Sequence, residues 1–158
     1  MPFDGLPVEP VRTLIAFEQR REVEFVDIRD CTELPKLRRG ADLTGVIELT
    51  IGPVALLGPD WESDIPGLWG AVADLVAGYR ENGRAEVRFP DQSAYLTLEP
   101  VPPGLVRITV LAGPYRETAV TGEEKLLSAL EAGAEEFFAK LEELTGRSVA
   151  GRRGPSAG

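Results

Sequence analysis

Three carboxylates flank a tryptophan within five residues of this chain, in the segment Asp60, Trp61, Glu62, Ser63 and Asp64. Acidic groups at this density could hold a hard cation, or surround an aromatic anchor for another protein. The segment lacks the twelve-residue pattern and the glycine of an EF-hand. Alternatively, the tryptophan packs into the core and the acids cap the next helix, whose dipole favours them. A catalytic carboxylate pair would need a raised pKa and a cleft, and the sequence indicates neither.

A second acidic feature lies near the C-terminus, where glutamates recur at helical spacing. We call this set the acidic ridge, and it consists of Glu124, Glu131, Glu135 and Glu142. At about 100° per residue the four side chains fall on one narrow strip of a helix. Like charges four residues apart destabilise an isolated helix slightly, so the arrangement suggests a surface for a basic partner. The alternative is an ordinary solvated helix face.

Histidine is absent from the sequence, and cysteine occurs once, at Cys31. The chain therefore lacks the commonest general base and metal ligand, and a Ser-His-Asp or Cys-His site within one chain is excluded. Zinc would have to rest on carboxylates alone, which is a poor ligand set for that metal. Cys31 fits best as a small buried hydrophobic residue. We expect a non-catalytic protein without a metal or a cofactor.

The length and charge of the chain narrow the class of protein. A chain of 158 residues is long enough to bury one substantial core. Its net charge of −9 argues against nucleic acid as a partner, because phosphate binding needs a basic surface. The first ten residues lack the pattern of a signal peptide, and no apolar run has the length of a membrane span. A cytoplasmic protein with no membrane contact is expected.

Two long helices are predicted to position these acidic groups. The first spans about residues 64–82, where apolar residues recur at three and four positions: Ile65, Leu68, Trp69, Val72, Leu75, Val76 and Tyr79. The second spans about residues 122–145 and carries a broad apolar face: Leu126, Leu127, Leu130, Ala134, Phe137, Phe138, Leu141 and Leu144. Thr121 and Glu124 fit a capping box at its start, and Gly146 fits its end.

The remaining face of the first helix is unusual, because it is built from small residues. It carries Gly67, Gly70, Asp74, Ala77, Gly78 and Glu81. Each glycine inside a helix costs roughly 1 kcal/mol relative to alanine. A second copy of the chain could pack closely on such a flat face, which suggests a structural homodimer. The alternative is compositional drift in a sequence rich in glycine and alanine.

The segments on either side of the first helix are rich in β-formers separated by short turns. Strands are predicted at about 22–29, 43–51, 54–57, 84–89, 94–99, 105–111 and 115–120, whereas 11–21 fits either a helix or a strand. This order predicts an α+β fold: one mainly antiparallel sheet of about five to seven strands with both helices on one face. Residues 1–10 form an extended lead-in, 11–146 a single domain, and 147–158 a disordered tail.

The order of several motifs resembles a family of small acidic actinobacterial proteins. These motifs are ADLTGVIELTIG (Ala41–Gly52), the Asp60-Trp61 loop, a helix bearing a tryptophan, and RFPDQ (Arg88–Gln92). The similarity covers roughly residues 8–146, and it implies no activity and no site residues. The size, acidity and layout of the chain are also similar to those of immunity proteins from bacterial toxin systems, an analogy of architecture and charge.

These observations predict a non-catalytic cytoplasmic domain that binds a protein of basic charge, as an immunity protein or antitoxin does. The contact is assigned to Asp60, Trp61, Glu62 and Asp64 together with the acidic ridge. Two alternatives stay open. One is a small-ligand-binding protein or carboxylate-based enzyme with a site near residues 60–64, and the other is a structural homodimer.

Overall fold

A computed structural model describes residues 5–37 and 42–153, and within these ranges the chain forms two antiparallel sheets and two long helices. The first sheet contains β1 (Arg12–Gln19), β2 (Glu22–Asp27), β3 (Thr44–Ile51), β4 (Val54–Leu57) and β5 (Ser63–Asp64). The second contains β6 (Ala85–Arg88), β7 (Tyr95–Val101), β8 (Leu105–Ala112) and β9 (Tyr115–Gly122). The helices are α1 (Ile65–Asn82) and α2 (Glu123–Arg153), with short 3-10 turns η1 (Ile28–Asp30) and η2 (Pro59–Trp61).

The predicted α+β class is confirmed, but the prediction of one sheet with about five to seven strands is wrong. The strand order is β2-β1-β3-β4 in the first sheet, where β5 also pairs with β3, and β6-β7-β8-β9 in the second. Short turns specify pairing between consecutive strands, and the second sheet follows that rule as a meander. They do not specify where the chain leaves one sheet, and here α1 carries it from the first sheet to the second.

The ambiguous segment at residues 11–21 forms β1, which pairs with both β2 and β3. Its side chains are buried on both faces: Leu14 and Ala16 on one, Thr13 and Ile15 on the other. A strand covered on both sides loses the polar–apolar alternation by which strands are recognised. The sequence pattern was therefore uninformative because β1 is an interior strand.

The described part of the lead-in, residues 5–10, joins the two sheets. Leu6 pairs with Thr121 of β9, and Val8 pairs with Ile51 of β3. Thr121 lies inside β9 with its hydroxyl donating to the carbonyl oxygen of Leu6, and Arg80 binds the Glu124 carboxylate, so the predicted capping box is wrong. Residues 1–4 lie outside the described part of the chain.

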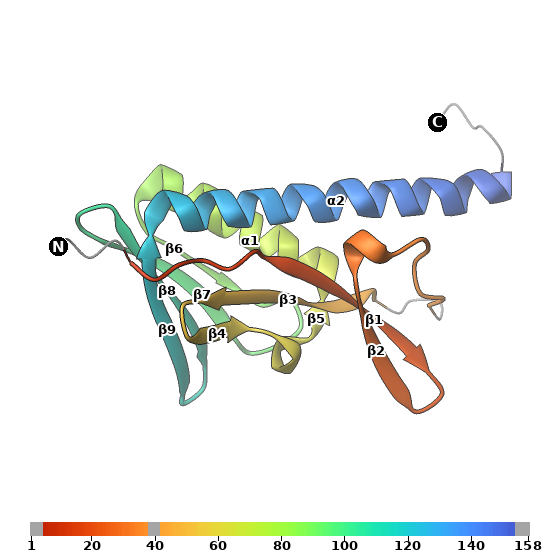
Figure 1. Ribbon diagram of the computed structural model, residues 1–158, viewed down its shortest axis with the longest axis horizontal. Helices are drawn as coiled ribbons and strands as arrows, with labels where there is room; N and C mark the ends of the chain where they lie inside the picture. Colours follow the sequence, from red (N-terminus) through yellow and green to blue (C-terminus); the bar gives the residue numbers. More distant parts are fainter. Residues whose placement is uncertain (1–4, 38–41, 154–158) are drawn as a thin grey trace.

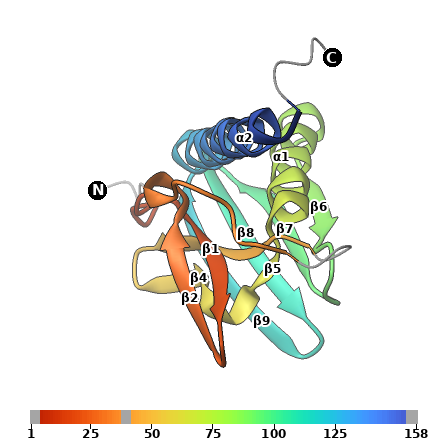
Figure 2. The same cartoon turned by 90° about the vertical axis from the view of Figure 1, so that its right-hand side faces the viewer.

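Both helices lie side by side along one side of the strands, as Figures 1 and 2 show. Asp64 caps α1 by accepting a hydrogen bond from the Gly67 amide, and Gly83 ends the helix with a φ of 78°. The predicted end of α2 is too early, because the helix continues to Arg153. Residues 147–153 of the predicted tail are thus helical, and 154–158 lie outside the described residues. None of the helices in the described ranges combines the length and apolar character needed to cross a membrane.

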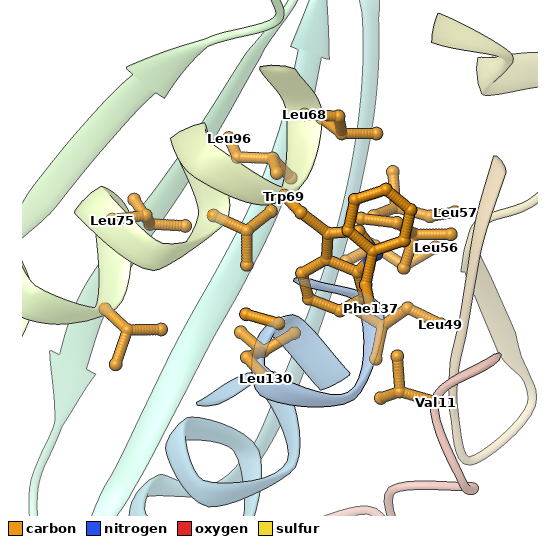
Figure 3. Close-up of a cluster of buried hydrophobic side chains, with 14 of the residues drawn as sticks. Val11, Leu49, Leu56, Leu57, Leu68, Trp69, Leu75, Leu96, Leu130 and Phe137 are labelled. Carbon is orange, nitrogen blue, oxygen red and sulfur yellow. The ribbon is translucent and has the colours of Figure 1, made fainter. Parts of the chain in front are cut away.

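The core forms around Trp69, which is 0% exposed. Figure 3 shows Trp69 of α1, Phe137 of α2 and Leu49 of β3 among the clustered apolar side chains. The indole Nε1–H donates to the Thr13 hydroxyl of β1 at 2.9 Å, so the one polar atom of the ring is satisfied. α2 crosses the ring at Gly133, where a Cβ would overlap the ring atom Cη2.

We expect Gly133→Ala to destabilise the protein by about 1–3 kcal/mol, because the added methyl group must displace the buried Trp69 ring. Gly70→Ala is the matched control, since Gly70 of α1 has open space where its Cβ would lie. That control should stabilise the protein by up to about 1 kcal/mol through helix propensity. Urea unfolding of both variants measures the difference, and a Gly133→Ala protein as stable as the control would contradict the packing described.

Candidate partner-binding surfaces

The acidic ridge lies along the solvent-facing side of α2, but half of it is neutralised from within the chain. Arg80, near the end of α1, donates from Nη2 to Glu124 at 2.8 Å and to Glu131 at 2.7 Å. The two helices therefore run antiparallel, with a charged clamp where α1 ends and α2 begins. Sequence reasoning missed Arg80, although it was the only basic residue expected in the last turn of the first helix.

The other half of the acidic ridge is available. Glu135 and Glu142 are exposed, and neither makes an ion pair or a side-chain hydrogen bond within the part of the chain that the structure describes. Both are farther along α2 than the residues that Arg80 binds. The charge open to a partner is thus concentrated on the second half of the predicted ridge.

Phe138 lies between these two glutamates and is 39% exposed, so its predicted place on the buried face of the helix is wrong. It follows Glu135 by three residues and precedes Glu142 by four, which are the spacings of neighbours on a helix surface. The buried neighbour, Phe137, meets its ring edge-on with centroids 5.2 Å apart. Helical arithmetic places Phe138 only about 40° from the centre of the acidic ridge, and this signal was present in the sequence.

The charged clamp changes the acid–base properties of its members. Two hydrogen bonds from Arg80 lower the pKa of the Glu124 carboxyl, and the Ser128 hydroxyl donates a third hydrogen bond that acts in the same direction. Next to the clamp, Tyr79 donates to Glu123 at 2.6 Å. Burial, followed by that hydrogen bond, raises the pKa of the Tyr79 hydroxyl. Tyr79 therefore stays protonated and fixes the first residue of α2 against α1.

The second predicted contact, the loop Asp60–Asp64, is built around a half-buried Trp61. Its ring packs against Phe89 with centroids 5.4 Å apart and against Tyr115 with centroids 5.6 Å apart. Phe89 is buried, whereas Tyr115 is 43% exposed at the start of β9. Trp61 thus closes the edge of the core and leaves only part of its ring to solvent.

Most acids of this loop are used by the fold. Glu62 accepts a hydrogen bond from the Thr44 hydroxyl at 2.9 Å, and Asp64 caps α1. Asp60 is exposed in η2. No group of three acidic, cysteine or histidine side chains in the described ranges is arranged to hold a metal ion. The helix-capping alternative thus holds for Asp64.

The structure does not bring the two predicted contact regions together. In Figures 1 and 2, which share their vertical axis, α2 runs along the top of the molecule and the yellow η2 turn lies well below it. The Asp60–Asp64 loop is instead braced by the turn between β6 and β7. Gln92 Nε2 donates to the Ser63 hydroxyl at 2.6 Å, and the Asp64 amide donates to Asp91 Oδ2 at 3.0 Å.

Two of the motifs quoted for the family resemblance are therefore in contact. Asp91 and Gln92, which belong to RFPDQ, form hydrogen bonds with the Asp60–Asp64 loop. These contacts support the start of α1. Comparison with known proteins returned no matching family model, no matching curated protein and no matching solved structure.

The ligand-site alternative places a pocket at residues 60–64, whereas three pockets among the described residues lie elsewhere. Two hollows of about 650 and 610 Å³ flank the segment Thr32–Leu37, and a third of about 330 Å³ lies beside Tyr79 and Arg80. None of the three is lined by Asp60, Glu62 or Asp64. Cys31 is buried as predicted, and burial raises the pKa of its thiol, which disfavours a reactive thiolate.

The small-residue face of α1 is partly covered by the chain itself. A Cβ on Gly67 would press on Asp64 and on Pro90, and one on Gly78 would touch Ala85. Only Gly70 of these three has open space around it. The chain's own strands thus account for two of the small residues, and the homodimer through this face stays a prediction.

Replacing Arg80 with Gln should lower the melting temperature at pH 7, and this deficit should shrink as the pH falls and Glu124 becomes protonated. The folded-state pKa of Glu124 is depressed, so its contribution to stability is present above the unfolded value of about 4.3 and is lost as the pH falls through the folded value. Arg84→Gln is the control, because Arg84 lies 4.0 Å from Glu99 and is highly exposed. Thermal unfolding from pH 7 to pH 3 checks this, and a pH-independent deficit would contradict it.

Proposed function

We propose that this chain is a non-catalytic cytoplasmic protein that binds a basic protein through the outer surface of α2, in the manner of an immunity protein or antitoxin. One observation carries the proposal: Phe138 is exposed between Glu135 and Glu142, whose carboxylates have no partner among the described residues. Protein interfaces commonly depend on an aromatic anchor inside a polar rim. Unpaired acids around such an anchor select a partner with an apolar pocket bordered by lysine or arginine.

The charge of the whole molecule acts in the same direction. A net charge of −9 attracts a basic protein over a distance of about one Debye length, roughly 8 Å at physiological salt. Such attraction raises the association rate more than it raises the affinity. The Trp61 loop has a smaller role in this proposal, because it lies away from α2 and most of its acids serve the fold. It joins the contact only with a partner large enough to reach both regions.

The test compares wild type with Glu135→Lys/Glu142→Lys. Glu124 and Glu131 are left in place, because changing them would break the pairing with Arg80 and confound binding with stability. The matched control is Glu22→Lys/Glu24→Lys on β2, which changes the net charge equally at exposed positions. Each protein is immobilised and exposed to a lysate of the native organism at low and high salt, and retained proteins are identified by mass spectrometry.

We expect one basic protein to be retained by wild type and by the control, and lost with the α2 variant and at high salt. With that protein purified, Phe138→Ala should weaken binding by at least about 1 kcal/mol, roughly fivefold, since an anchor side chain is removed. Equal loss with both double variants would indicate a general charge effect. An association rate that does not change with salt, or a partner retained by the α2 variant, would contradict the proposal.

A further inference from the structure

The outer face of the β6–β9 sheet carries the opposite charge to α2. Residues paired across neighbouring antiparallel strands share a face, and one such row runs across all four strands: Arg88, Tyr95, Leu111 and Arg116. The opposite face of the sheet carries core residues such as Leu98 and Ile108. On the face of the row itself, Leu105 and Thr109 are buried, whereas Arg88 and Arg116 are exposed. Tyr95 is 39% exposed and lies between the two arginines along the row. This row is thus an aromatic residue flanked by positive charge on an open sheet.

The arginines of this face differ from those that connect elements of the fold. Arg12, Arg29 and Arg80 each contact a carboxylate on another element. Within the described residues, the guanidinium groups of Arg88 and Arg116 make no ion pair and no hydrogen bond. Arg107 of β8 lies on the same face and is equally unpaired. Two glutamates share the face, Glu86 and Glu99, and Glu99 is next to Arg84. We call Arg88, Tyr95, Arg107, Leu111 and Arg116 the basic face.

The basic face and the surface around Phe138 have the same arrangement of residues but opposite charge. Each places an exposed aromatic ring between two unpaired charges. Glu135 and Glu142 are seven residues apart on α2, which corresponds to about 10.5 Å along the helix. Arg88 and Arg116 are separated by three strand spacings, or about 14 Å. The long, flexible arginine side chains can bridge that difference and reach both carboxylates.

We propose that this protein self-associates head to tail, with the Phe138 surface of one copy docked on the basic face of another. Phe138 would lie on Tyr95 and Leu111, and the two carboxylates would meet Arg88 and Arg116. The inference rests on the proposed function in one respect, because it assigns the same α2 surface a second occupant. A basic partner and a second copy therefore compete for α2. Because each copy presents both surfaces, association can extend beyond two copies.

The net charge determines how this association depends on salt. Two copies with a charge of −9 repel each other at long range when salt is low, since the Debye length is about 30 Å at 0.01 M. At about 0.15 M the long-range repulsion is screened, whereas the contacting pairs are not. At about 1 M the contacting pairs are screened too. Association should therefore be strongest at intermediate salt, which distinguishes it from association driven by apolar contact alone.

The experiment is sedimentation analysis of the purified full chain over a range of concentrations at three salt concentrations. The first variant is Arg88→Glu/Arg116→Glu, and the second is Glu135→Arg/Glu142→Arg. Each places like charges on both surfaces, so each alone should associate at least tenfold more weakly than wild type. Mixing the two restores opposite charges at both contacts and should restore association. Arg20→Glu/Arg21→Glu, at the exposed tip of the β1–β2 hairpin, is the matched control and should behave as wild type.

A monomeric wild type at all concentrations and salts would overturn the proposal, as would variants that associate like wild type or a mixture that stays monomeric. Circular dichroism of each variant confirms that it is folded before its mass is interpreted. The experiments distinguish failure of the partner-binding proposal from failure of the self-association proposal. The Arg88→Glu/Arg116→Glu protein keeps the Phe138 surface, so it should capture a basic partner as well as wild type does. Captured partner without self-association would reject only the head-to-tail contact.

Discussion

The close approach of Trp69 and Gly133 is the constraint on which the arrangement of this protein depends. The indole is buried beneath α2 and is held from the other side by its hydrogen bond to Thr13. Because only a residue without a side chain can lie over the ring, α2 can rotate about its axis very little. Gly133 lies about 180° from the centre of the acidic ridge on the helix. The packing that buries Trp69 therefore also turns the acidic ridge and Phe138 toward solvent.

The lead-in has a comparable effect on the strands. Its backbone bonds to Val120 of β9 through Leu6 and to Thr50 of β3 through Glu9, so it connects the two sheets. The Asp60–Asp64 loop and the β6–β7 turn hold the sheets together at the start of α1. The helices cover one side of the strands and these connections join the two sheets, so the inner face of β6–β9 is buried. On its outer face Arg88, Tyr95 and Arg116 are exposed. This outer face is the one that carries unpaired arginines.

The sequence predicts the elements of this fold better than it predicts their partners. The period of α1 and its bounds are local properties, and the predicted span of about residues 64–82 agrees with the structure. Thr121 shows the limit: its spacing to Glu124 matches a capping box, yet its hydroxyl binds Leu6, which is 115 residues away in sequence. Likewise, four glutamates on one strip of a helix are readable from spacing, whereas the pairing of two of them with Arg80 depends on tertiary packing. The exposure of Phe138, in contrast, could have been predicted from its angular position beside the acidic ridge on the helix.

Several arginines of this protein pair with carboxylates where two elements of the fold meet. Arg12 joins β1 to Asp27 and to Glu48 of β3, and Arg29 joins η1 to Glu136 of α2. Exposed pairs of this kind add little stability, so their effect is chiefly on the orientation of the elements. Among the carboxylates and guanidinium groups left over, Glu135 and Glu142 flank Phe138, and Arg88 and Arg116 lie in one row with Tyr95. The net charge of −9 therefore does not describe either of these two surfaces by itself.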